Sequence, residues 1–148
     1  MPILYFDTCA LVKRYYKENG HEKVKQLINT STNTVVLNDF GSVEVASALR
    51  KKYRQNDLTE TNARLRLARF LYDRGKEYTV YDTTSSVLLD SIGLVSKHDL
   101  RSLDSIHLST ALKIREKHPN LQFVTADGDL YQAAESEGMN PIWPGKPT

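Results

Sequence analysis

Short apolar runs alternate with longer amphipathic stretches along the chain. Four runs, at 3–6, 34–37, 77–82 and 122–126, are rich in β-branched and aromatic residues and are bounded by polar ones, which predicts β-strands. These runs show little alternation of apolar and polar positions, as is typical of strands covered on both faces of a parallel sheet. Residues 140–143 (NPIW) predict a last, short edge strand.

The stretches between these runs have helical periodicity. We predict helices over 9–18, from Gly20 through Ile28, over 42–53, from Thr59 to Gly75, from Thr83 or Thr84 through Val95, over 103–117 and over 129–138. Asn38 or Asp39 is expected to cap the third helix, and Pro119 cannot continue the sixth. Strands that alternate with helices predict the α/β class, here a three-layer α/β/α sandwich with a mainly parallel central sheet.

Length and composition exclude few functions. The chain has 148 residues, so we expect a single domain over residues 1–148. Its net charge of +2 neither requires nor excludes a nucleic-acid partner. Cys9 is the only cysteine, which argues against an intrachain disulfide and a thiolate-rich zinc site. No apolar run approaches the roughly 18 residues of a membrane span, so we predict a soluble, cytoplasmic protein with no membrane partner.

Two predicted strands lead directly into an acidic residue. The first run ends at Asp7 and the run 122–126 ends at Asp127, with Asp129 two residues further on. Sites in parallel sheets form beyond the carboxyl ends of the strands, so Asp7 and Asp127 are expected at one edge. Aspartate is also a favoured N-cap, and for either residue alone a cap is the commoner role.

Two further acids lie on predicted helices among apolar residues. Glu44 is the only charged side chain in 42–49, where an ionised carboxylate needs a cation or strong donors. The alternative for Glu44 is an exposed first-turn position. Asp104 lies near the middle of the apolar arc of 103–117 and needs a partner there. Its alternative is a first-turn acid bound by backbone N–H groups, with Ser102 as the cap.

Four acids at one edge of a sheet repel one another unless cations neutralise them or some remain protonated. Carboxylates and water are the ligands that Mg²⁺ and Mn²⁺ prefer, and such ions activate water for attack on phosphorus. Acids without cysteines or paired histidines therefore favour metal-dependent phosphodiester hydrolysis over zinc chemistry.

Four segments resemble the motifs of PIN domains. They are 5–16 (YFDTCALVKRYY), 42–52 (SVEVASALRKK), 100–112 (LRSLDSIHLSTAL) and 123–134 (FVTADGDLYQAA), and they occur in the order and spacing of that family. Within the family, the compact chain resembles the VapC toxins of type II toxin–antitoxin pairs. The resemblance implies a PIN-like fold and an endoribonuclease that hydrolyses RNA phosphodiester bonds with one or two Mg²⁺ or Mn²⁺ ions.

The resemblance also implies which residues form the site. Asp7, Glu44 and Asp104 would be the core metal ligands of the catalytic centre. Asp127 would complete the acidic, metal-binding set, directly or through water.

Supporting residues and partners follow from the same resemblance. Thr8 and Thr125 would supply supporting hydroxyls, and Asp129 would share the role of Asp127 or cap the last helix. Proteins of this type are commonly homodimers that act on RNA. A small antitoxin protein silences them by filling the active-site groove.

Basic residues near two of the acids are candidates for binding RNA phosphates. Lys13 and Arg14 follow Asp7, while Arg50 and Lys51 follow the segment that carries Glu44. For most of these side chains, a solvated helix surface with acid–base pairs is the commoner role. Tyr15 and Tyr16 have the chemistry to stack on bases, although aromatic residues at such positions usually belong to the core.

Two other kinds of protein compete with a metal-dependent nuclease. A non-catalytic PIN-like RNA-binding module would keep the fold without the reaction, and a receiver-like signalling module also gathers acids at strand ends. A receiver normally adds a lysine after a late strand, which 122–127 (QFVTAD) lacks.

Arg101 and His107 form an R-x5-H pattern similar to that of HEPN ribonucleases, but those are helical proteins. Inside its apolar arc, His107 is expected to be a hydrogen-bonded core residue.

Overall fold

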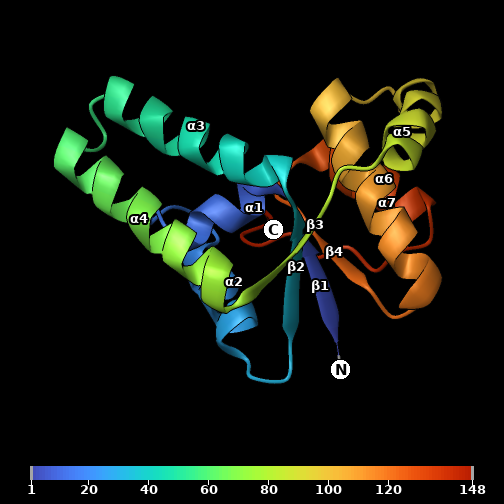
Figure 1. Cartoon of the computed structure of the whole chain (residues 1–148), viewed down its shortest axis with the longest axis horizontal. Coiled ribbons are helices and arrows are strands. Elements are labelled where there is room, and N and C mark those ends of the chain that lie inside the picture. Colours follow the sequence, from blue (N-terminus) through green and yellow to red (C-terminus); the bar gives the residue numbers. More distant parts are fainter. Residues whose placement is uncertain (1, 148) are drawn as a thin grey trace.

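The computed structural model describes residues 2–147, in which four strands form one parallel sheet (Figure 1). The strands are β1 (Ile3–Phe6), β2 (Thr34–Asn38), β3 (Tyr78–Tyr81) and β4 (Gln122–Val124), in the order β3-β2-β1-β4. All four agree with predicted runs. The expected strand at 140–143 reduces to one bridge, in which Ile142 N–H donates to the Phe123 carbonyl at 2.8 Å.

Seven α-helices and a 3-10 turn connect and follow the strands within residues 2–147. They are α1 (Thr8–Leu11), η1 (Val12–Arg14), α2 (His21–Asn29), α3 (Phe40–Arg54), α4 (Glu60–Lys76), α5 (Ser85–His98), α6 (Ser102–Lys117) and α7 (Gly128–Ser136). No helix in this range is long and apolar enough to cross a membrane.

Two predicted helix boundaries are wrong. The helix expected over 9–18 ends at Arg14, because α1 tightens into the 3-10 turn η1 and the chain then leaves the helical path. Gly75 does not end α4, which continues to Lys76. A glycine ends a helix when it takes a left-handed conformation, and Gly75 is not among the residues with positive φ.

Polar side chains close the first turns of most helices. Thr59 and Thr84 cap α4 and α5, as the sequence predicted. At the start of α3 both candidates take part: the Asp39 carboxylate accepts from Phe40 N–H at 2.8 Å, and Asn38 Oδ1 accepts from Gly41 N–H at 3.0 Å. These bonds satisfy N–H groups that have no partner inside the helix.

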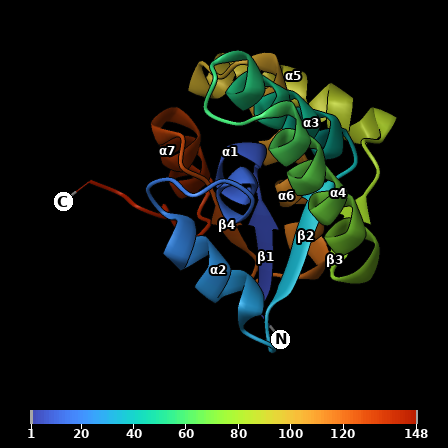
Figure 2. The same ribbon diagram turned by 90° about the vertical axis from the view of Figure 1, so that its left-hand side faces the viewer.

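Alternate strand residues enter two separate apolar clusters, one on each face of the sheet. Leu4 and Phe6 of β1 pack with α1 to α4, whereas Tyr5 packs with α5 to α7. Figure 2 shows the first of these helical layers in front of the sheet. The predicted three-layer α/β/α sandwich is confirmed, and its central sheet is wholly parallel.

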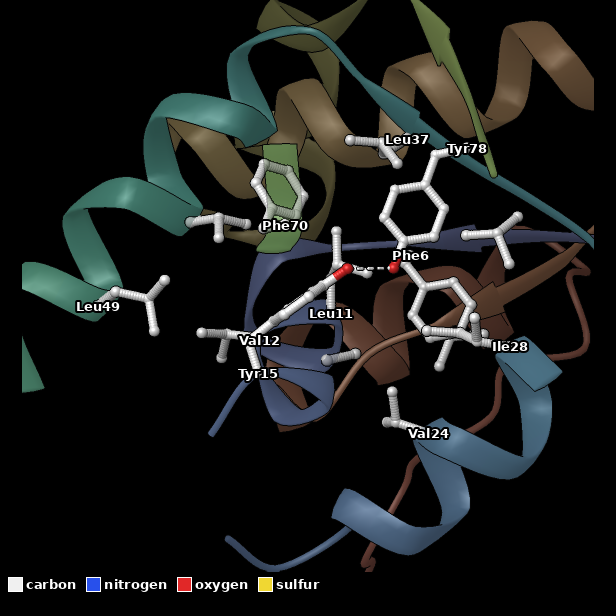
Figure 3. Close-up of a cluster of buried hydrophobic side chains, with 14 of the residues drawn as sticks. Phe6, Leu11, Val12, Tyr15, Val24, Ile28, Leu37, Leu49, Phe70 and Tyr78 are labelled. Atoms are coloured by element: carbon white, nitrogen blue, oxygen red, sulfur yellow. Dashed lines mark hydrogen bonds between the residues drawn. The ribbon is translucent and has the colours of Figure 1, made fainter. Parts of the chain in front are cut away.

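A buried polar network lies inside the first apolar cluster. The Tyr15 hydroxyl donates to Asp73 Oδ2 at 2.7 Å and lies beside the Tyr78 hydroxyl, as the dashed line between the two rings in Figure 3 shows. Arg14 donates to the Tyr78 hydroxyl at 2.6 Å and pairs with Glu77 at 2.8 Å. Tyr15 is therefore a core residue, as its pattern favoured, and Arg14 is bound within the fold.

The order of the strands places a topological switch beside β1. The chain moves outward from β1 to β2 and β3, then returns to the opposite side of β1 to form β4. Clefts for ligands form at such switch points, beyond the carboxyl ends of the strands. Asp7 and Asp127 follow the two strands on either side of this switch.

Candidate active site

Asp7 is a helix cap and a buried acid at the same time. Its Oδ1 accepts from Ala10 N–H at 3.0 Å and so caps α1, while Oδ2 accepts from the Thr125 hydroxyl. The Cys9 thiol donates to both oxygens at 3.1 Å. Burial raises the pKa of Asp7, and these donors and His107 offset only part of that effect. Capping α1 does not exclude a role for Asp7 in the site, because the capping bond uses only Oδ1.

Asp127 repeats this arrangement at the end of β4. Its Oδ1 accepts from Leu130 N–H at 2.9 Å and caps α7. Its own N–H donates to the Thr125 hydroxyl at 3.1 Å, so Thr125 joins the Asp127 backbone to the Asp7 carboxylate. Asp129 is exposed in the first turn of α7 and is not the cap.

Glu44 faces donors inside the protein. Its Oε1 accepts from the Thr8 hydroxyl at 2.8 Å and lies 2.7 Å from His107 Nε2. Burial alone would raise the pKa of Glu44, but the hydrogen bond and charge of His107, with Thr8, lower it below its ordinary value. The side chain is 26% exposed and lies beyond the first turn of α3, so the alternative of an exposed first-turn glutamate is wrong.

The pKa of Asp104 depends on the charges of the other three acids. Burial, followed by the negative charges of Asp127, Asp7 and Glu44, raises this pKa to about 6 against the opposing effect of His107. Asp127, Asp7 and Glu44 therefore each lie within electrostatic range of Asp104. Ser102 is not the cap of α6. The cap position is Arg101, which makes no side-chain capping bond.

The donor set fits a hard divalent cation. Asp7, Glu44, Asp104 and Asp127 all offer carboxylate oxygens, and the repulsion that the other three exert on Asp104 is what a cation would relieve. Within residues 2–147, no group of three or more acids, histidines and cysteines is close enough to enclose an ion in the present arrangement of side chains. Mg²⁺ commonly binds through one or two carboxylates and keeps several waters, so an open acidic edge suits it.

The basic candidates differ in how freely they could meet a phosphate. Lys13 pairs with Glu18 at 3.4 Å, and Arg50 pairs with Glu60 at 3.6 Å while its guanidinium covers the Tyr53 ring. Arg14 is committed to Tyr78 and its neighbours. Lys51 is exposed near the end of α3.

Two side chains at the site were not predicted to belong to it. His107 is 2% exposed and hydrogen-bonded, as expected of a core histidine, but one of its partners is Glu44. A signal existed, since His107 follows Asp104 by one helical turn on the same face. Cys9 follows Asp7 by two residues, and only the geometry of α1 brings its thiol back to that carboxylate.

Comparison with known sequences gives one family and two similar ribonucleases. The model of the PIN domain matches residues 4–136. Ribonuclease VapC45 of Mycobacterium tuberculosis strain CDC 1551 is 27% identical over 145 residues, which cover 93% of this chain and 93% of that protein. Ribonuclease VapC49 of strain H37Rv of the same species has the same identity and coverage.

Solved structures share the fold at low sequence identity. Mycobacterium tuberculosis VapC20, named as a toxin that cleaves the sarcin–ricin loop, has a TM-score of 0.67 at 15% identity. The match covers 95% of this chain and 99% of that one. A toxin–antitoxin complex from Klebsiella pneumoniae has a TM-score of 0.62 at 19% identity, covering 95% and 97% of the two chains.

Proposed function

Because this chain belongs to the PIN-domain family, we propose that it is a toxin endoribonuclease that uses Mg²⁺ or Mn²⁺ to hydrolyse RNA phosphodiester bonds. The observation that carries the proposal is the match of the PIN domain to residues 4–136, with Asp7 and Asp127 at the ends of β1 and β4 on either side of the switch point. The raised pKa of Asp104 adds support, because the charges of the other three acids contribute to it. A cation would neutralise these charges and, when bound, would polarise the phosphate and activate a water. The four motifs support the same conclusion.

Each acid has a distinct place in the proposed site. Asp7, Glu44 and Asp104 would hold one or two ions, and Asp127 would complete the set directly or through water. The Thr125 hydroxyl fixes the orientation of Asp7, and Thr8 does the same for Glu44. Asp129 is exposed beside Asp127, where it could contact a water of the ion.

RNA would approach this edge against the repulsion of the acids. Lys51 is exposed and Arg50 is only weakly paired, so these two side chains of α3 are the basic candidates for phosphate binding. Replacing both with alanine should weaken RNA binding and reduce its salt dependence. Unchanged binding would exclude them.

A small antitoxin protein is the proposed partner that silences the nuclease in the cytoplasm. The support is the likeness to VapC ribonucleases and to a toxin–antitoxin complex. Cleavage should stop when a small antitoxin protein that binds this chain is added in equal amount. Continued cleavage in a complex that does form would contradict silencing.

Self-association is proposed through α5. Four of its apolar side chains are exposed, and contiguous exposed apolar surface usually marks a protein interface. They are Leu88, Leu89, Ile92 and Val95. Sedimentation should report a dimer for the natural chain and a monomer for Ile92→Lys, whereas Leu71→Lys on α4 serves as the matched control. A monomeric natural chain would contradict the proposal.

The decisive test is RNA cleavage with a matched pair of variants. Purified protein should cut total RNA with Mn²⁺, not with EDTA, and Asp7→Asn should remove the activity. Asp57→Asn changes an exposed acid between α3 and α4 and should cut normally. Protein that binds RNA equally well in EDTA and never cuts it would instead be a non-catalytic binding module. Sequencing the cut ends would identify the target.

A further inference from the structure

His107 connects three elements of the site through one buried ring. Its Nδ1 lies 2.7 Å from the Tyr5 hydroxyl of β1, and its Nε2 lies 2.7 Å from Glu44 Oε1 of α3. The histidine itself belongs to α6, one turn after Asp104. The imidazole on the helix of Asp104 therefore contacts the acid of α3, although the resemblance to the family gave His107 no role in the site.

The two ring nitrogens of His107 have different partners. An ionised carboxylate only accepts, so the proton between His107 and Glu44 belongs to Nε2. At Nδ1, the Tyr5 hydroxyl donates to a neutral ring or accepts from a protonated one. In either state, Tyr5 holds the ring so that Nε2–H points at Glu44.

Packing holds the ring of His107 in place. The Phe40 ring lies 4.7 Å away, and the Tyr5 ring meets it edge-on at 5.8 Å. At Gly41, a Cβ atom would lie 3.8 Å from the histidine ring. The imidazole therefore has little freedom to turn away from Glu44.

The two oxygens of Glu44 are used unequally. Oε1 receives both the Thr8 hydroxyl and His107 Nε2, whereas Oε2 has no hydrogen-bond partner among the described residues. A carboxylate held by one oxygen presents the other in a defined direction. Partners that orient a ligand in this way commonly change metal affinity by about 10–100-fold when they are removed.

We propose that His107 is a positioning residue, which, oriented by Tyr5, holds Oε1 of Glu44 and leaves Oε2 as the oxygen that would bind a metal ion. The proposal rests on the proposed function, because it takes Glu44 as a ligand. It differs from a purely structural role in what it predicts. A core histidine would affect folding alone, whereas a positioning residue changes the affinity of the folded protein for the ion.

The test measures Mn²⁺ binding to the full chain without RNA, by electron paramagnetic resonance, beside the free energy of unfolding without metal. His107→Leu should weaken Mn²⁺ binding about 10–100-fold. His107→Gln keeps an amide donor toward Glu44 and should recover part of the affinity. His98→Leu removes a histidine–glutamate contact elsewhere, with Glu137, and should bind Mn²⁺ normally.

Tyr5→Phe keeps the ring and removes only the hydroxyl that meets His107 Nδ1, so it tests the same inference if His107→Leu does not fold. It should weaken Mn²⁺ binding severalfold. Unchanged affinity in folded His107→Leu, or in Tyr5→Phe, overturns the inference. Glu44→Gln separates the two proposals: if it abolishes binding while His107→Leu does not, Glu44 remains a ligand and only the positioning role fails.

Discussion

Asp104 is kept in the fold at a cost in stability at neutral pH. Its carboxylate is half-buried near three other acids, and its pKa rises from 3.8 to about 6 as a result. The folded protein therefore binds this proton more tightly than the unfolded chain does. Stability contributed by the protonated form is present at low pH and is lost as the pH rises through about 6.

Asp104→Asn should remove that dependence. Without metal, the variant should gain stability relative to the natural chain at pH 7.5, where the folded Asp104 is ionised, and should lose most of that advantage near pH 4.5, where the folded Asp104 is protonated. Urea denaturation at the two pH values measures the difference. Asp57→Asn, on the surface, should show no comparable change. An equal difference at both pH values would mean that Asp104 is not under electrostatic strain.

The residue types and their order in the sequence predicted which acids are candidates for the site, but not which hydrogen-bond partners orient each of them. Asp7 and Asp127 could be placed because strands lead into them. The contact between Glu44 and His107 could not, because it joins residues 63 apart and depends on how α3 packs against α6. The pattern of residues along one helix shows which of its faces is apolar, but it does not show which side chain of another helix will contact that face.

Helices and strands were predictable where periodicity and caps agreed. Thr59 and Thr84 marked the starts of α4 and α5 in the sequence, and Pro119 lies just beyond the end of α6. The errors came at residues whose effect depends on conformation. Gly75 stays helical, whereas Gly20 has φ +94° and precedes α2. Both residues are glycines, and only their backbone conformations distinguish a residue that precedes a helix from one that continues it.

These two glycines give a matched pair of substitutions. Gly20→Ala should destabilise the protein by more than about 1 kcal/mol, because its φ is positive and a Cβ would lie 2.7 Å from the Pro144 carbonyl oxygen. Gly75→Ala meets nothing within 4 Å and lies in a helix, so it should stabilise by up to about 1 kcal/mol. Thermal denaturation of both variants measures the signs. Equal effects would contradict the assigned conformations.

The whole molecule assembles its acidic edge from segments distributed along almost all of the chain. Asp7 follows β1, Glu44 and Asp104 lie on α3 and α6, and Asp127 begins α7. The strand order was not readable from local patterns, because the return of β4 to the far side of β1 is decided by packing of both helical layers. An ion held at this edge would bind the folded chain alone.

Metal should therefore raise the melting temperature of the protein. At a free ion concentration of about 100 times Kd, the gain is roughly 2.7 kcal/mol, or about 5–10 °C for a chain of this size. Melting curves with Mg²⁺ or Mn²⁺ against EDTA measure the shift. Asp104→Asn should lose most of it, while Asp57→Asn should keep it. A curve that millimolar metal leaves unmoved would contradict the site.

The bond from Thr125 to Asp7 spans 118 residues and joins the first strand to the last. During translation, Asp7, Glu44 and Asp104 are all synthesised before Thr125 and Asp127. A growing chain therefore lacks the strand that fixes Asp7, and we expect it to be inert. Such a delay would spare the messenger and the ribosome that are still producing the nuclease.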